Sequence, residues 1–139
     1  MGSAGIAAGL WNNVLVVGAE VLSSLINWQD RNTCVLFGDG AGAMVLSARS
    51  EGSIARIFAS DLRSEGTKHD LICLPGGLVQ NPASMKTVEE NLHTVQMKGN
   101  EVFKFVNQAL PGFLHDSCEK AGIEAKEIAW WIFHQANLR

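Results

Sequence analysis

Residues 130–139 read Trp-Trp-Ile-Phe-His-Gln-Ala-Asn-Leu-Arg, and this stretch decides the fold that we expect. A short apolar run that changes abruptly to a histidine and two side-chain amides is typical of a buried strand that ends in a polar loop. Open sheets flanked by helices usually place ligand sites at such strand ends. We therefore expect a buried strand over residues 130–133 that delivers His134 to a site, where an imidazole can donate or accept a proton. The alternative is a histidine that is satisfied by a backbone hydrogen bond.

The length and composition predict one compact domain, and the mixed order of strands and helices along the chain predicts the α/β class. The chain has 139 residues, of which 47% are hydrophobic and 18% charged, so it is long and apolar enough to bury a core. A net charge of −3 without a Lys/Arg stripe argues against a nucleic-acid platform, and no apolar run reaches the roughly 18–20 residues that span a bilayer. Cys34, Cys73 and Cys118 are odd in number and far apart, which argues against a disulfide framework or a metal site and predicts a reducing, cytoplasmic location.

Upstream of the final stretch, four apolar runs read as strands. Residues 14–17, ended by Gly18, are β-branched and should be covered on both faces. Residues 34–37 read as a second buried strand, which enters a glycine turn over residues 38–43 and leaves through residues 44–46. Shorter strands are expected at 54–58 and 71–74, with parallel pairing for the most apolar strands. The glycine turn is not a dinucleotide fingerprint, because its spacing is Gly-x-Gly-x-Gly and an apolar run follows where a helix is required.

The helices have clearer signals than the strands. Residues 6–10 read as the end of a helix, and Ser84 is placed to cap a short polar helix. The clearest helix follows Met97, where apolar residues at helical spacing form a wide stripe. Pro111 should kink that helix, and Gly122 should end it.

Each candidate site residue also has a structural explanation. Cys34 within an apolar run reads as an inert small hydrophobe, and Asp39 between glycines reads as a turn former. Arg31 beside Asp30 predicts an exposed ion pair of little worth, and Phe103 on the helix stripe predicts a core position. Only His134 with Asn137 combines an acid–base group and an amide on one loop.

Four blocks of sequence together resemble the β-ketoacyl-acyl carrier protein synthase III family of the thiolase superfamily. They are Val-Val-Gly-Ala-Glu-Val-Leu-Ser (16–23), Asp-Arg-Asn-Thr-Cys-Val-Leu-Phe-Gly-Asp-Gly-Ala-Gly-Ala (30–43), Met-Lys-Gly-Asn-Glu-Val-Phe-Lys (97–104) and His-Gln-Ala-Asn-Leu-Arg (134–139). The resemblance implies a partial thiolase-like fold of layered sheet and helices. Residues of about 1–50 would end the first half of that fold, and residues of about 51–139 would begin the second.

The resemblance also implies an acyltransferase chemistry of fatty-acid biosynthesis. Family members move an acyl group from acyl-coenzyme A onto a cysteine and condense it with malonyl-acyl carrier protein. Such enzymes need no metal or cofactor beyond the coenzyme A thioester substrate. His134 would hydrogen-bond the thioester oxygen as negative charge builds on it. Nothing in this chain matches the family's nucleophilic cysteine or its second catalytic asparagine, so we expect a central fragment that is inactive alone.

Other site residues follow from the same blocks. Arg31 would stack on the adenine of coenzyme A, while Lys104 and Arg139 would attract the acidic carrier protein. Asp39 would bond backbone amides at a corner beneath the site. The substrate tunnel would be lined by Asn32, Leu36, Phe37, Met97, Gly99, Phe103, Ala136 and Asn137.

The implied partners are acyl-coenzyme A, acyl carrier protein and a second copy of the chain. Family members are homodimers, and a partial layered fold should expose apolar faces that drive association into a dimer or a larger homo-oligomer. Three alternatives stay open: a non-catalytic module that binds coenzyme A or carrier protein, a structural remnant, and another condensing enzyme of the thiolase superfamily.

Overall fold

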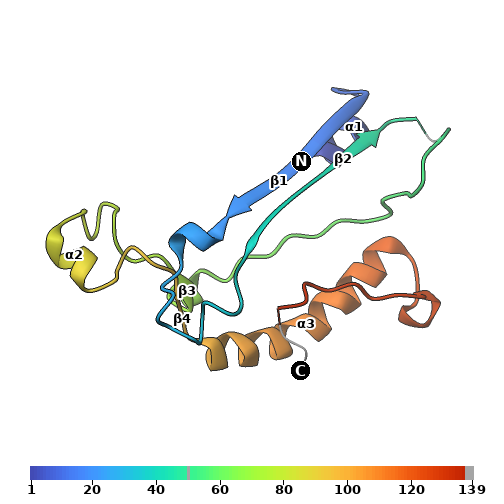
Figure 1. Ribbon diagram of the computed structural model, residues 1–139. Helices are drawn as coiled ribbons and strands as arrows, with labels where there is room; N and C mark the ends of the chain where they lie inside the picture. Colours follow the sequence, from blue (N-terminus) through green and yellow to red (C-terminus); the bar gives the residue numbers. More distant parts are fainter. Residues whose placement is uncertain (50, 137–139) are drawn as a thin grey trace.

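A computed structural model describes residues 1–49 and 51–136 of the chain. Helices and short antiparallel sheets alternate along it (Figure 1). In chain order the elements are α1 (Gly2–Ala7), β1 (Asn13–Val21), β2 (Asp39–Ser47), β3 (Ile72–Cys73), α2 (Met85–Glu89), β4 (Gln96–Met97) and α3 (Gly99–Ala121), with 3-10 turns at Leu22–Leu25, Gly66–Lys68 and Ala125–Glu127.

The longest sheet is a two-stranded ribbon of β1 and β2. The strands pair antiparallel, from Asn13 opposite Ser47 to Val21 opposite Asp39, so the expected parallel pairing was wrong. The expected glycine turn at residues 38–43 was also wrong, because β2 runs straight through most of this segment. Glycines at every second position share one face of an extended strand, so the Gly-x-Gly-x-Gly spacing fits a strand as well as it fits a turn.

Three other expected strands are absent from the described residues. Residues 31–36 form consecutive turns, and residues 55–60 and 129–135 have no strand pairing. In the first segment the backbone N–H groups of Thr33 and Cys34 both donate to the carbonyl of Asp30, at 3.2 and 3.0 Å. Strand-like composition does not by itself produce pairing, because pairing needs a partner strand that only the tertiary structure supplies.

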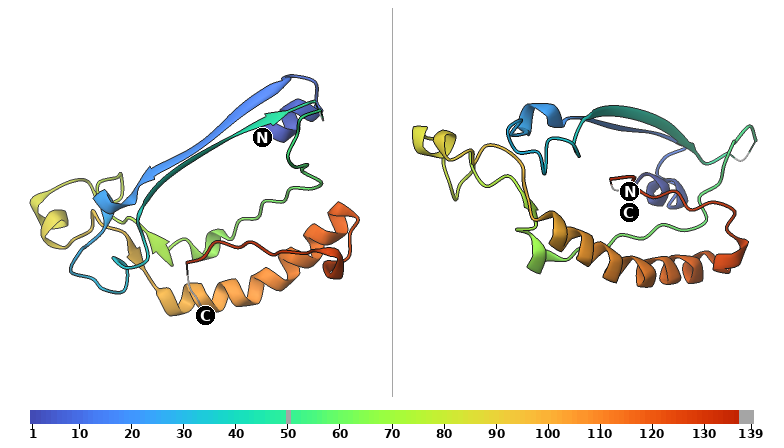
Figure 2. Two further views of the ribbon diagram at one scale, coloured as in Figure 1. Left: turned by 45° about the vertical axis from the view of Figure 1, so that its right-hand side comes forward. Right: turned by 60° about the horizontal axis from the view of Figure 1, so that its bottom comes forward.

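The helix predictions were largely confirmed. Ser84 caps α2 and accepts a hydrogen bond from the backbone N–H of Thr87. The helix α3 continues through Pro111, and its axis bends near the middle (Figures 1 and 2). Gly122 ends α3 in the left-handed conformation, with φ 67° and ψ 32°. The first helix, α1, ends at Ala7, earlier than expected.

One face of the ribbon is open. Helix α1 packs against the other face, where an added Cβ at Gly2 would lie 3.1 Å from Val14 and 3.3 Å from Leu46. The open face consists of side chains that are exposed by more than half: Leu15, Val17, Val21 and Val45. The expected burial of β1 on both faces was therefore wrong.

The chain as a whole buries little. Its accessible surface is 11615 Å², whereas a compact monomer of 15.0 kDa would expose about 7,000 Å². Among the described residues only Ile26, Leu71 and Cys118 form a buried apolar core. The expectation of one compact domain with a real core was wrong for the chain by itself.

The ribbon and α3 lie on opposite sides of the molecule, and they meet at one end around β3 and β4 (Figures 1 and 2). Two backbone hydrogen bonds hold this junction together. The N–H of Val95 donates to the carbonyl of Leu25 at 2.8 Å, and the N–H of Lys98 donates to the carbonyl of Leu71 at 2.9 Å. The junction therefore brings the segment after β1 next to the start of α3.

Candidate functional site

The predicted site residues fall into two groups at the junction and a third group on the carboxyl-terminal segment. The loop between β1 and β2 carries Arg31, Asn32, Leu36 and Phe37. The second group follows β3 along the chain, on β4 and the start of α3. We describe each group from its backbone outward.

The base of the β1–β2 loop is closed by Asp39, the first residue of β2. Its carboxylate accepts from the backbone N–H of Ser23 at 2.8 Å and from the Ser23 hydroxyl at 2.6 Å. The hydroxyl and then the N–H of Ser23 lower the pKa of Asp39, because both donate to its charged form. The expectation that Asp39 bonds a backbone amide was confirmed, although it does so at a strand end.

The tip of the loop is shaped by Asp30. One carboxylate oxygen accepts from the backbone N–H and the side-chain amide of Asn32, both at 3.0 Å. The other accepts from the Thr33 hydroxyl at 2.8 Å. These donors, the backbone N–H of Asn32 first, lower the pKa of Asp30. Thr33 is 1% exposed, so the turn is anchored by a buried side chain.

Arg31 does not pair with Asp30. The described residues include no ion pair to Arg31, and both oxygens of its neighbour Asp30 are engaged by Asn32 and Thr33. The expected exposed ion pair was therefore wrong. Arg31 is exposed, so its guanidinium plane is available for a ligand.

The second group lies where β4 leads into α3. Met97 is half-buried on β4, Gly99 is the first residue of α3, and Phe103 is 43% exposed one turn later, where a core position was expected. The ion pair of Lys98 with Asp70, at 2.5 Å, fixes this corner. The hydrogen bond from Lys98 lowers the pKa of Asp70, and the same contact raises the pKa of Lys98.

Gly99 has room for a side chain within this chain. An added Cβ would meet only the Met97 methyl group, at 3.4 Å, and its φ is not in the left-handed region. The fold therefore does not require glycine at this position. Any requirement for glycine would come from a ligand that approaches the start of α3.

His134 lies on the segment after α3, which runs back along that helix (Figures 1 and 2). On this segment the rings of Trp131 and Phe133 stack on each other, with their centroids 6.2 Å apart. The imidazole of His134 is exposed, as is Ala136, so the expected buried strand is replaced by an exposed extended segment. The predicted residues Asn137 and Arg139 lie outside the described residues. Lys104 is exposed on the first turns of α3.

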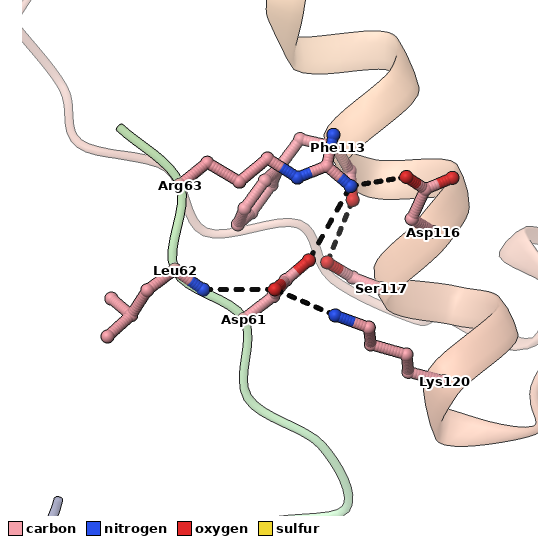
Figure 3. Close-up of polar contacts among 7 residues, drawn as sticks. All are labelled: Asp61, Leu62, Arg63, Phe113, Asp116, Ser117 and Lys120. Atoms are coloured by element: carbon pink, nitrogen blue, oxygen red, sulfur yellow. Dashed lines mark hydrogen bonds and ion pairs between the residues drawn. The ribbon is translucent and has the colours of Figure 1, made fainter. Parts of the chain in front are cut away.

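A polar cluster that the sequence did not predict fastens the segment before β3 to α3 (Figure 3). Lys120 donates to Asp61 at 2.7 Å, and Arg63 pairs with Asp116 and lies 5.3 Å above the Phe113 ring. The hydrogen bond from Lys120 lowers the pKa of Asp61, whereas Asp116 raises that of Arg63. No local pattern could have revealed this cluster, because both ion pairs to α3 join residues more than fifty positions apart in sequence.

Within the described residues one group could hold a cation. Donor atoms of His115, Asp116 and Glu119 lie within 4.8 Å of one another on α3. Asp116 is already paired with Arg63, and the other two side chains are exposed, so this group has the character of a solvated helix surface. In the same ranges, no helix has the length and apolar character needed to cross a bilayer.

Known proteins similar to this chain include several named as acyl-carrier-protein synthase III. The family model of 3-Oxoacyl-[acyl-carrier-protein (ACP)] synthase III matches residues 1–66. Beta-ketoacyl-[acyl-carrier-protein] synthase III from Caldanaerobacter subterraneus subsp. tengcongensis is 46% identical over 134 residues, which cover 96% of this chain and 40% of that protein. The same-named protein from Symbiobacterium thermophilum is 46% identical over 139 residues, covering 100% of this chain and 42% of that protein.

A solved structure agrees. The crystal structure of 3-oxoacyl-[acyl-carrier-protein] synthase III from Aquifex aeolicus VF5 is 37% identical and matches with a TM-score of 0.71, over 90% of this chain and 35% of that one. The fold described here is thus part of a thiolase-like fold, and the chain spans about 40% of the length of the curated relatives it matches. By sequence and by fold, this chain belongs to the β-ketoacyl-acyl carrier protein synthase III family.

Proposed function

We propose that this chain forms part of a 3-oxoacyl-acyl carrier protein synthase III-type condensing enzyme of fatty-acid biosynthesis. Its residues of about 1–50 would end the first half of the fold, and those of about 51–139 would begin the second. The observation that carries the proposal is 46% identity over 96% of the chain to a protein of that description. Acyl-coenzyme A, malonyl-acyl carrier protein and a second subunit would be its partners, in the cytoplasm.

His134 would supply a hydrogen bond to the thioester oxygen. As malonyl thioester loses carbon dioxide, negative charge builds on that oxygen, and a donated hydrogen bond from the imidazole Nε2 stabilises it. The exposure of His134 supports this role, because a ligand can reach the ring. Removal of one such donor typically lowers the rate on the order of 10²–10³-fold.

Coenzyme A would lie along the junction. Arg31 would stack its flat cation on the adenine, and the pantetheine arm would pass Met97, Gly99 and Phe103. The wider tunnel lining would also take in Asn32, Leu36, Phe37, Ala136 and Asn137. The hydrogen bond between Leu25 and Val95 supports this proposal, since it holds the two groups at the same end of the molecule.

The entrance to the substrate tunnel would be positively charged. Lys104 and Arg139 would steer the acidic carrier protein, and such long-range attraction weakens as salt rises. Lys104 is exposed on α3, as this role requires.

The chain by itself would form no acyl-enzyme. Cys118 is buried, and Cys34 and Cys73 are half-buried; none of the three lies in a block that resembles the family's nucleophile. Incubation with radiolabelled acetyl-coenzyme A should leave no label on the protein. A stable protein-bound acetyl group, located by mass spectrometry on one of these cysteines, would contradict this part of the proposal.

Calorimetric titration with coenzyme A tests the tunnel. We expect heat of binding at millimolar ligand, which Arg31→Ala and Gly99→Ala should reduce. Gly112→Ala is the matched control, because an added Cβ there meets nothing within 4 Å on the same helix. Absence of binding by the wild-type chain, or equal effects of the two glycine variants, would refute the proposed tunnel.

The second candidate is a non-catalytic module that binds coenzyme A. The burial of Cys118 and the half-burial of Cys34 and Cys73 agree with this candidate as well as with the first. Release of carbon dioxide from malonyl-coenzyme A separates the two when the chain is supplied together with the segments of the enzyme that it lacks, because only a condensing-enzyme part should then show release that falls with His134→Ala. Binding without any release would favour the module.

A further inference from the structure

We propose that Asp30, acting with Thr33, is a positioning residue that holds Arg31 and Asn32 ready for the adenine half of coenzyme A. This inference rests on the proposed role of Arg31 in coenzyme A binding. Neither Asp30 nor Thr33 would touch the ligand.

The geometry of the turn supports this role. Asp30 uses both carboxylate oxygens inside the turn, one for the Asn32 amide groups and one for the Thr33 hydroxyl. Its own carbonyl accepts from the N–H groups of Thr33 and Cys34. The Thr33 hydroxyl also donates to this carbonyl, at 3.3 Å. Asp30 therefore accepts six hydrogen bonds, and the backbone of Arg31 lies between their donors and acceptors.

The carboxylate's engagement also leaves the neighbouring cation available. An aspartate next to an arginine would normally compete with a ligand for the guanidinium. Here the oxygens of Asp30 accept instead from Asn32 and Thr33, and the described residues offer Arg31 no other carboxylate. A guanidinium without a carboxylate partner can stack on an aromatic ring or face an anion without first breaking an ion pair.

Two anchors limit the movement of the whole loop. Thr33 is 1% exposed at the tip, and the contacts of Asp39 with Ser23 close the base. Binding to a loop that is already ordered avoids the entropic cost of ordering it. When coenzyme A binds, only the side chain of Arg31 would then have to become ordered.

The test compares two variants of Thr33 that differ in the hydroxyl. Thr33→Val keeps the shape and removes the donor, while Thr33→Ser keeps the donor; Asp30→Ala removes the acceptor. The ligands are the two halves of coenzyme A, adenosine 3′,5′-bisphosphate and pantetheine, titrated by calorimetry. We expect Thr33→Val and Asp30→Ala to weaken the adenine half about tenfold, roughly the net worth of one hydrogen bond, with pantetheine unchanged and Thr33→Ser close to wild type.

Tryptic cleavage after Arg31 gives a readout that needs no ligand. Release of the turn should accelerate this cleavage in Thr33→Val and leave cleavage after Arg56 unchanged. Equal weakening of both ligand halves would mean that the turn has a merely structural role. Unchanged affinity with faster cleavage would mean that order in the turn does not matter for binding. Either result would overturn the positioning role and leave the proposed tunnel standing. A wild-type chain that binds neither half would remove the proposed tunnel, and the positioning role with it.

Discussion

The open face of the β1–β2 ribbon should drive this chain to associate, and two charges placed on it should weaken that association. Leu15 is 66% exposed and Val17 is 61% exposed. Complete burial of one such side chain contributes about 1.5–3 kcal/mol. Burial of the exposed two thirds of both side chains would therefore contribute roughly 2–4 kcal/mol per subunit, which for two subunits corresponds to about a 700-fold to 5 × 10⁵-fold change in Kd.

The perturbation is the double variant Leu15→Lys with Val17→Lys. Both residues share the face of the ribbon that α1 does not cover, so neither lysine should disturb the contacts of Val14 and Leu46 with that helix. The matched control is Gln80→Lys with Gln108→Lys, which adds the same charge at two exposed polar positions. Light scattering coupled to size-exclusion chromatography, over a range of micromolar concentrations, measures the mass.

We expect the wild-type chain and the control to have masses of at least twice 15.0 kDa and the double variant to dissociate at concentrations where they do not. The chain exposes several thousand Å² more than a compact monomer does, and a stable interface needs only about 1,600 Å² in total. A wild-type chain that stays at 15.0 kDa throughout would refute the reasoning. So would a double variant that associates as strongly as the control.

Two further predictions concern local contacts. The hydrogen bond from Lys98 lowers the pKa of Asp70. This pair should therefore contribute fully to stability above the ordinary aspartate pKa of about 3.9, and its contribution should be lost as the pH falls through the lowered value. In Lys98→Met the pKa of Asp70 measured by NMR titration should rise, and an unchanged titration would contradict the contact. At the end of α3, Gly122→Ala should cost about 1 kcal/mol of helix stability, because φ there is 67°. Gly122→Asn, which tolerates the left-handed region, should cost less in a thermal melt followed by circular dichroism, and equal melting of the two variants would contradict the assignment.

Local signals account for the predictions that were confirmed. The apolar stripe of α3, its end at Gly122 and the cap at Ser84 all depend on residues within a turn or two of each other. The strand at residues 14–17 follows from its β-branched composition. The four blocks allowed the family to be identified for a similar reason, because each block is a run of adjacent residues.

Most of the wrong predictions concern partners that are distant in sequence, whereas the one for Asp30 concerns near neighbours. The runs at residues 34–37 and 130–133 have strand-like composition, yet neither pairs. The carboxylate of Asp30 was assigned to Arg31 because they are adjacent, although Asn32 and Thr33 hold it. An aspartate followed two residues later by an asparagine is a turn signal that could have indicated this.

The sequence by itself determined the family, the long helix and its end, and the residue types that the proposed roles of Arg31 and His134 need. Only the tertiary structure decided that the ribbon is antiparallel and open on one face, that the loop after β1 meets the start of α3, and that Asp61 and Arg63 fasten to α3. The physical reason is that propensities and caps act between near neighbours, whereas pairing, burial and ion pairs depend on which distant segment comes within a few ångströms.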